Sequence, residues 1–261
     1  MAKNDPDTLL GIGLYSPREA ALYARCSTQK LSRWFYGTAK AEPVLSPQLG
    51  PDSDRIVTFL DFAQSLSVNE IRLSIGIPLQ KIRAAYMAAQ EEFGVKYPLA
   101  VENGIFVFGD LARPNKCELA IYLPDRGHDA AEWKQERLAA ISERCVQLTG
   151  KHRGNFLISR VVRQFSHNLI FGEDGVATRY VAFKHHRHNI VMDPQIRFGK
   201  PYLEDSGYEA QTLADAVLAE KSPERVATLY RVEVAAVRAA LEYQQLLKTP
   251  PTRTPPKRNA A

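Results

Sequence analysis

Two short helices joined by a tight turn near the N-terminus constrain the fold of this chain more than any other feature. Residues 16–19 read Ser-Pro-Arg-Glu, a complete helix start: the serine can cap, the proline suits the first helical position, and the glutamate closes a capping box. We predict a first helix from here to about Tyr23, a turn over residues 24–26, and a second helix from the cap Ser27 to about Tyr36. This order is typical of a helix-turn-helix.

The second helix has two chemically different faces when successive residues are placed 100° apart. Leu31, Trp34 and Phe35 cluster on the face that would pack inward. The opposite face carries side chains suited to a DNA major groove, because Arg can form two hydrogen bonds to guanine and Gln two to adenine. Lys30 and Lys40 are better suited to phosphate. An ordinary helical hairpin with a solvated polar face is the alternative. The predicted DNA-binding residues are Thr28, Gln29, Lys30, Ser32, Arg33, Tyr36 and Lys40.

The charge balance is consistent with an anionic partner. The chain has 261 residues, a formal net charge of +5, 45% hydrophobic and 24% charged residues. These fractions are ordinary for a globular protein, and the positive charge favours nucleic acid first and an anionic membrane surface second. Nine basic and three acidic residues lie between positions 151 and 200. Alternatively, those basic residues only solubilise the surface.

Cysteine usage and the absence of apolar runs indicate the compartment. Cys26, Cys117 and Cys145 are scattered and form no CxxC pair, as expected for reduced thiols in the cytosol. The first residues lack the apolar stretch of a signal peptide, and no run approaches the roughly 18 apolar residues that a membrane-spanning helix needs. We therefore expect a cytoplasmic protein with no membrane partner.

The rest of the chain shows further helices and strands. Residues 37–55 are rich in Pro and Gly and predict a loop or a short hairpin wing. Asp174-Gly175 between two apolar runs predicts a hairpin. By apolar periodicity, helices are expected at 59–74, 79–93, 130–148, 157–165, 212–218, from 222 onward and at 233–247, and strands at 105–108, 119–123, 169–171 and 176–183.

These elements predict an α+β fold that is mainly α, in four parts. Residues 1–100 form a winged helix-turn-helix domain, and residues 101–189 a small mixed α/β middle region with β-hairpins. Residues 190–247 form a C-terminal three-helix domain, and residues 248–261 a disordered basic tail without core-forming residues.

Two parts of the chain resemble known families. Residues 15–37, with their Ser-Pro-Arg-Glu-Ala-Ala opening and Leu-Ser-Arg-Trp-Phe-Tyr-Gly close, resemble the winged helix-turn-helix of MerR-like regulators, and residues 59–62 and 77–83 look like the helices that follow it. The C-terminal unit resembles the family called domain of unknown function 433. It departs from that family at residues 203–209, where a Gly-Thr-Arg-like step is usual. The resembling segments are residues 190–194, 197–201, 221–227 and 237–243.

This domain order resembles VapB-type antitoxins of bacterial toxin–antitoxin pairs. The resemblance implies a type II antitoxin that binds a cognate toxin, commonly a PIN-type ribonuclease, and represses its own operon. Because a ribonuclease site is acidic, we expect Arg253, Lys257 and Arg258 of the tail to bind the toxin. The alternative function is a MerR-like transcriptional regulator that senses a small ligand.

Helix-turn-helix proteins usually bind paired half-sites as dimers, so a homodimer is expected. Phe62, Leu66, Ile82 and Tyr86 could form the dimer contact. Equally, these four residues could form the core of their own domain.

Catalytic and metal chemistry are not indicated. His185-His186-Arg187-His188 is the obvious metal candidate, but adjacent strand residues point to opposite faces, whereas zinc ligands converge. We interpret this run as a solvated or phosphate-contacting strand end. No nucleophile elbow, phosphate-binding loop or zinc-protease motif is present. The prediction is a protein that is not an enzyme, with no cofactor, metal or catalytic residue.

Overall fold

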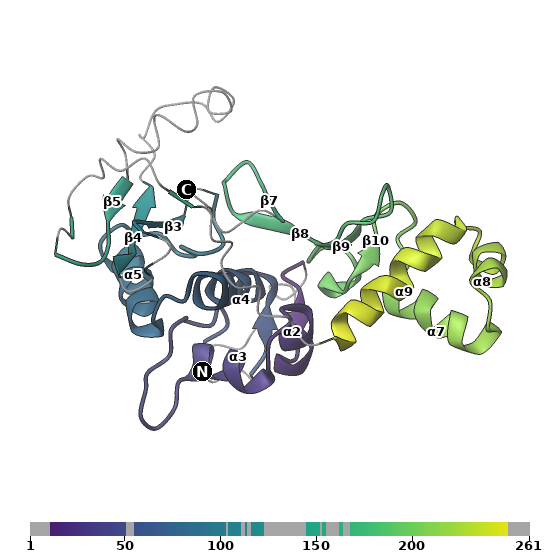
Figure 1. Ribbon diagram of the computed structural model, residues 1–261, viewed down its shortest axis with the longest axis horizontal. Coiled ribbons are helices and arrows are strands. Elements are labelled where there is room, and N and C mark those ends of the chain that lie inside the picture. Colours follow the sequence, from purple (N-terminus) through teal and green to yellow (C-terminus); the bar gives the residue numbers. More distant parts are fainter. Residues whose placement is uncertain are drawn as a thin grey trace.

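The computed structural model describes residues 11–50, 55–102, 104–110, 113, 116–122, 145–151, 153–154, 162–163 and 168–249. Within these residues the fold is mixed, with more helical than strand residues and three antiparallel sheets. Figure 1 shows the N-terminal helices between a sheet on one side and a second sheet with the C-terminal helices on the other. None of the described helices is long and apolar enough to cross a membrane.

The predicted helix pair forms as expected. Helix α2 spans Pro17–Tyr23 and helix α3 spans Thr28–Tyr36. The Ser16 hydroxyl accepts from the Glu19 amide at 3.2 Å, and the Glu19 carboxylate accepts from the Ser16 amide at 2.9 Å, so the capping box is complete. The Ser27 hydroxyl accepts from the Lys30 amide and caps α3. Both helix starts were therefore readable from local chemistry.

A short strand pair joins the residues just before α2 to the residues that precede the next helix. Strand β1 (Leu14–Tyr15) pairs with β2 (Val57–Thr58) in antiparallel fashion. In the described part of the segment between α3 and β2, only an isolated bridge between Thr38 and Ala41 is strand-like. The amides of residues 44 and 45 both donate to the Trp34 carbonyl. The predicted wing is thus a loop folded back onto α3.

The next two helices build the core. Helix α4 (Phe59–Glu70) continues into a π-helical turn, η1 (Ile71–Ile75), and α5 spans Leu79–Glu91, in agreement with the helices expected at 59–74 and 79–93. Phe62, Ile82 and Tyr86 are at most 1% exposed, and Leu66 packs against the same core. The suggestion that these four residues form a dimer contact is wrong, because their apolar surface is already used inside the domain.

The middle region contains a four-stranded sheet in the order β5-β4-β3-β6. Strands β3 (Ile105–Phe108) and β4 (Glu118–Tyr122) lie where they were predicted. The helix expected up to residue 148 is wrong at its end, because β5 (Cys145–Gln147) pairs with β4; residues 130–144 lie outside the described residues. The helix expected at 157–165 is likewise wrong at Val162–Arg163, because these residues form strand β6, which pairs with β3.

The second sheet has the order β10-β9-β8-β7. The predicted hairpin is confirmed: β7 (Leu169–Phe171) and β8 (Ala177–Phe183) are joined through Gly175, whose φ is +72°. Strands β9 (Ile190–Met192) and β10 (Tyr202–Leu203) complete the sheet. The sheet therefore crosses the domain boundary expected at 189/190, since the C-terminal unit contributes two of its strands.

Three helices form the C-terminal unit, as predicted. Helices α7 (Ala210–Glu220), α8 (Pro223–Tyr230) and α9 (Val234–Lys248) follow a 3-10 turn, η4 (Arg197–Gly199). Ser222 caps α8 by accepting from the Arg225 amide at 3.2 Å. A separate apolar cluster, which includes Leu213, Val226 and Val237, holds the helices together.

One carboxylate in the core is expected to make stability depend on pH. Asp61 is 1% exposed and accepts from the amides of Thr58 and Gln48, but desolvation by burial raises its pKa to about 6. An unfolded Asp titrates near pH 3.9, so between about pH 4 and 6 folded Asp61 keeps a proton that the unfolded chain has released. This difference in proton binding stabilises the folded state. The stabilisation is complete below about pH 4 and is lost as pH rises through about 6.

We expect the free energy of unfolding to fall by about 3 kcal/mol between pH 4 and 7 through this group, since one pKa unit is worth about 1.4 kcal/mol. Asp61→Asn should lack this decline, which urea unfolding at several pH values measures. The exposed Asp215→Asn on α7 is the matched control and should keep it. A decline of equal size in Asp61→Asn and the parent would contradict the assignment.

Candidate nucleic-acid interface

Helix α3 separates its apolar and polar residues as the sequence predicted. Leu31, Trp34 and Phe35 are buried in the main core. The side chains of Thr28, Gln29, Lys30 and Arg33 are exposed, and Ser32 is half-buried beside them. The structure records no hydrogen bond from the Gln29 or Arg33 side chain to the described residues. A rigid helix thus presents donors and acceptors that are available to an external partner.

Tyr36 does not lie as expected. Its hydroxyl is buried without a hydrogen-bond partner among the described residues, and desolvation raises its pKa. The Arg55 guanidinium lies 5.5 Å from the centre of the Tyr36 ring. The tyrosine hydroxyl is therefore buried and does not belong to the exposed polar face of α3. Arg55 is exposed at this edge and brings a positive charge there that helical periodicity alone did not indicate.

Lys40 lies in the turn that follows α3. Thr38 and Ala41 are bridged across this turn, and the Lys40 amide donates to the Thr38 hydroxyl at 3.3 Å. The lysine side chain is exposed. The turn therefore holds an exposed cation beyond the C-terminal end of α3.

Hydrogen bonds join the C-terminal unit to the N-terminal segment at Tyr15 and at Arg25. The Tyr15 hydroxyl donates to the Gly199 carbonyl at 2.8 Å in a buried contact, and this burial raises the tyrosine pKa. The Arg25 guanidinium, in the turn between α2 and α3, donates to the Thr249 carbonyl at 3.3 Å. In Figure 1 the end of α9 accordingly lies next to α2. Residues about two hundred positions apart thus join the two units.

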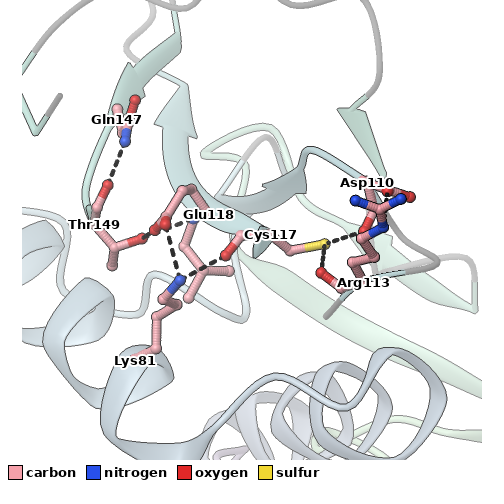
Figure 2. Close-up of polar contacts among 8 residues, drawn as sticks. Lys81, Asp110, Arg113, Cys117, Glu118, Gln147 and Thr149 are labelled. Atoms are coloured by element: carbon pink, nitrogen blue, oxygen red, sulfur yellow. Dashed lines mark hydrogen bonds and ion pairs between the residues drawn. The ribbon is translucent and has the colours of Figure 1, made fainter. Parts of the chain in front are cut away.

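A polar network links α5 to the middle sheet. Figure 2 shows Lys81 pointing from α5 toward β4, where its ammonium donates to the Glu118 carboxylate at 2.9 Å and to the Cys117 carbonyl at 2.7 Å. The Thr149 hydroxyl donates to the same carboxylate. The Cys117 thiol donates to the Asp110 carbonyl, and burial raises its pKa, which makes it a poor nucleophile. We interpret the network as a structural joint, since its charges pair with each other.

The histidine run is a solvated strand end only in part: His186 and Arg187 are exposed, whereas His185 and His188 are packed. His188 is 3% exposed, with Nδ1 2.5 Å from an Asp205 carboxylate oxygen and Nε2 3.4 Å from one of Glu233. His185 Nε2 lies 3.5 Å from a Glu242 carboxylate oxygen. These side chains therefore tie the β8–β9 connection to the C-terminal helices instead of facing phosphate. In the described part of the chain, no group of three or more residues is arranged to hold a metal ion.

Comparison with known proteins supports part of the sequence interpretation. Residues 190–244 match the family model described as protein of unknown function DUF433. The C-terminal resemblance is thereby confirmed, over 55 residues. No curated protein sequence matches this chain. The crystal structure of Rv2018 from Mycobacterium tuberculosis is similar, with a TM-score of 0.55 and 20% identity, covering 89% of this chain and 98% of that one. At this identity the likeness is one of fold.

The toxin-binding residues predicted in the tail, Arg253, Lys257 and Arg258, lie outside the described residues. The structure describes the first two residues of the predicted tail, Lys248 and Thr249. Thr249 directly follows α9 and lies at the turn between α2 and α3.

Proposed function

We propose that this protein is a cytoplasmic, non-enzymatic antitoxin of a type II toxin–antitoxin pair, which binds its own operator and a PIN-type ribonuclease toxin. The observation that supports DNA binding best is the polar face of α3. Its exposed Gln29 and Arg33 project from a helix whose other face is locked in the core by Leu31, Trp34 and Phe35. Because the helix backbone is already fixed, binding has to order only the side-chain rotamers.

In this proposal α3 lies in the major groove and α2 crosses the sugar-phosphate backbone, as in a MerR-like winged helix-turn-helix. Arg33 reads guanine and Gln29 reads adenine, while the hydroxyls of Thr28 and Ser32 reach bases or phosphates. Lys30 and Lys40 neutralise phosphates and set the register. Two copies bind paired half-sites about one DNA turn apart as a homodimer, for which the buried residues of α4 and α5 are not the contact.

The toxin would be held by the C-terminal unit. Leu218 on α7 and Leu229 on α8 are 72% and 66% exposed, large values for leucines in a folded unit. They lie on successive helices, and the cost of exposing large apolar side chains makes both candidates for a protein contact that excludes water. We assign this pair, the exposed leucine pair, to the toxin interface.

The experiment that tests the proposal co-expresses this chain with the product of the neighbouring gene and measures protection of the cells and binding of the promoter. Cutting the chain at 189/190 would remove two strands from a sheet, so point variants are preferable. Leu218→Ser/Leu229→Ser should lower toxin affinity by roughly 100-fold or more, because burying each leucine is worth about 1.5–3 kcal/mol. Promoter binding should survive.

Met87→Ser is the matched control, since Met87 is a 39% exposed residue on α5. It should keep both protection and promoter binding. Full protection by the double leucine variant would remove the exposed leucine pair from the toxin interface. Failure of the parent chain to neutralise the neighbouring product would refute the antitoxin proposal itself.

A cavity favours the second candidate, a MerR-like regulator that senses a small ligand. A space of about 450 Å³ lies between the start of α4 and the second sheet, and Phe59, Ala177 and Asp193 contribute to its walls. Gln48 also lines it, with a buried side-chain oxygen that has no hydrogen-bond partner among the described residues. A small molecule that changes operator affinity while the neighbouring gene product has no effect would favour this candidate.

A further inference from the structure

We infer that the cavity between the start of α4 and the second sheet binds a small organic cation, a primary amine that carries an aromatic or branched aliphatic body. This ligand chemistry deepens the second candidate function, on which only the expected effect on operator binding rests. The site itself is carried by three properties of the cavity: its apolar walls, its unpaired acceptors and its charge.

The cavity has the size and the apolar lining of a small-molecule site. Its volume is about 450 Å³, and such sites usually measure about 300–1,000 Å³. Phe59 and Ala177 are 1% and 4% exposed, so the surrounding core holds these two walls in place. The Phe59 amide also donates to the Ile12 carbonyl at 2.9 Å, which fixes a third wall. The apolar lining residues are Ile12, Phe59, Leu60, Ala177 and Pro194.

An acidic side chain in the lining has an oxygen available to a donor. The side chain of Asp193, just after β9, is 16% exposed, and its Oδ1 accepts from the Gln195 amide at 2.9 Å. Oδ2 lies 3.5 Å from Arg179 Nε, an atom that makes no hydrogen bond to the described residues. The Arg179 guanidinium donates instead to the Glu204 carboxylate at 2.9 Å. Asp193 Oδ2 thus has an ion pair without a hydrogen bond.

The local charge favours a cation over an anion. Two carboxylates, Asp193 and Glu204, flank the single guanidinium of Arg179, so one negative charge is left over. Gln48 adds a side-chain oxygen that is buried without a partner among the described residues. An ammonium group has three donors and no acceptor, so it supplies what these oxygens lack. A ligand carboxylate would instead meet Asp193 with like charge, which is unfavourable.

The walls of the cavity come from both parts of the chain. Gln48 belongs to the loop after α3 and Phe59 to α4, whereas Asp193 lies in the segment that matches the DUF433 model. A ligand bound there contacts the DNA-reading part and the C-terminal unit at once. That is the placement that an effector of operator binding needs.

The test compares three probes that share an indole body and differ in the head group: tryptamine is a cation, tryptophol is neutral and indoleacetate is an anion. Calorimetric titration of the full-length chain without DNA should show tryptamine binding roughly 10-fold or more tighter than tryptophol, because hydrogen bonds to charged groups are the stronger ones. Indoleacetate should bind most weakly. This comparison uses the parent chain and depends on no variant.

Asp193→Asn should weaken tryptamine binding by roughly 10-fold or more and leave tryptophol binding nearly unchanged. The asparagine oxygen can still accept from the Gln195 amide, so thermal unfolding should be unaffected. Glu173→Gln is the matched control, because it removes the same charge from an exposed position in the turn between β7 and β8. It should bind tryptamine as the parent does.

No binding of tryptamine, equal affinity for the three probes, or tighter binding of indoleacetate would overturn the inference. Undiminished tryptamine binding by Asp193→Asn would do the same. Operator affinity measured with and without tryptamine separates the site from the function. If tryptamine binds but operator affinity does not change, the site stands and the second candidate function fails. If the chain binds its promoter but not tryptamine, the site fails and the antitoxin proposal is untouched.

Discussion

Alanine at both Gln29 and Arg33 is expected to weaken binding of the promoter by about 2–6 kcal/mol, on the order of 30- to 10⁴-fold. Each residue is assigned a bidentate contact with a base, and such a contact is worth about 1–3 kcal/mol of discrimination. Arg33→Ala alone should cost about 1–3 kcal/mol. Both side chains are exposed and outside the core, so thermal unfolding should be unchanged and the loss can be assigned to recognition.

A competition gel shift with promoter and unrelated duplexes measures the effect, because base contacts and phosphate contacts respond differently. The double variant should lose its preference for the promoter. Lys30→Ala, the matched control on the same helix, should weaken binding to every duplex alike and reduce the salt slope by about one. Unchanged promoter affinity in the double variant would exclude the polar face of α3 as the reading surface.

Gly199→Ala is expected to destabilise the protein by about 2–5 kcal/mol. Gly199 has φ +84°, where a residue with a Cβ costs roughly 1–2 kcal/mol. The added Cβ would also lie 2.1 Å from the Tyr15 hydroxyl oxygen, which must then move away from the Gly199 carbonyl. Losing a buried hydrogen bond in this way adds about 1–3 kcal/mol. Urea unfolding measures the sum.

Gly207→Ala separates the two causes. Gly207 has a similar φ of +71°, but no heavy atom lies within 4 Å of the position of an added Cβ. Only the conformational cost of about 1–2 kcal/mol should appear there. Tyr15→Phe combined with Gly199→Ala should lose less than the sum of the single changes, since one atom is involved in both. Equal losses for the two glycine variants would show that the Tyr15–Gly199 contact does not hold the units together.

Interactions between residues close together in the sequence determined where helices begin and which face of α3 is buried. Ser16, Ser27 and Ser222 each cap a helix through an amide three positions away, so both partners are visible in the sequence. The burial of Leu31, Trp34 and Phe35 follows from a period of 3.6 residues. The hairpin at Gly175 could also be predicted from local sequence, because the turn and both strands lie in one short segment.

Short strands were harder to predict from the sequence, because three residues are too few to show an alternating pattern. Cys145–Gln147 continued a helical repeat, but its pairing with β4, more than twenty residues earlier in the chain, decided its conformation. The resemblance at residues 190–244 identified the C-terminal segment, yet it did not show that β9 and β10 complete a sheet begun by β7 and β8.

Only the tertiary structure decided which distant residues meet. The Tyr15–Gly199 and Arg25–Thr249 contacts join residues separated by 184 and 224 positions. Nothing local requires either contact, because each depends on how the N-terminal core and the C-terminal helices pack against the sheet between them. The same packing buries Phe62, Ile82 and Tyr86 inside one domain and His188 between two carboxylates. The amino-acid sequence determined the two faces of α3; long-range packing brought the end of α9 beside the turn that precedes it.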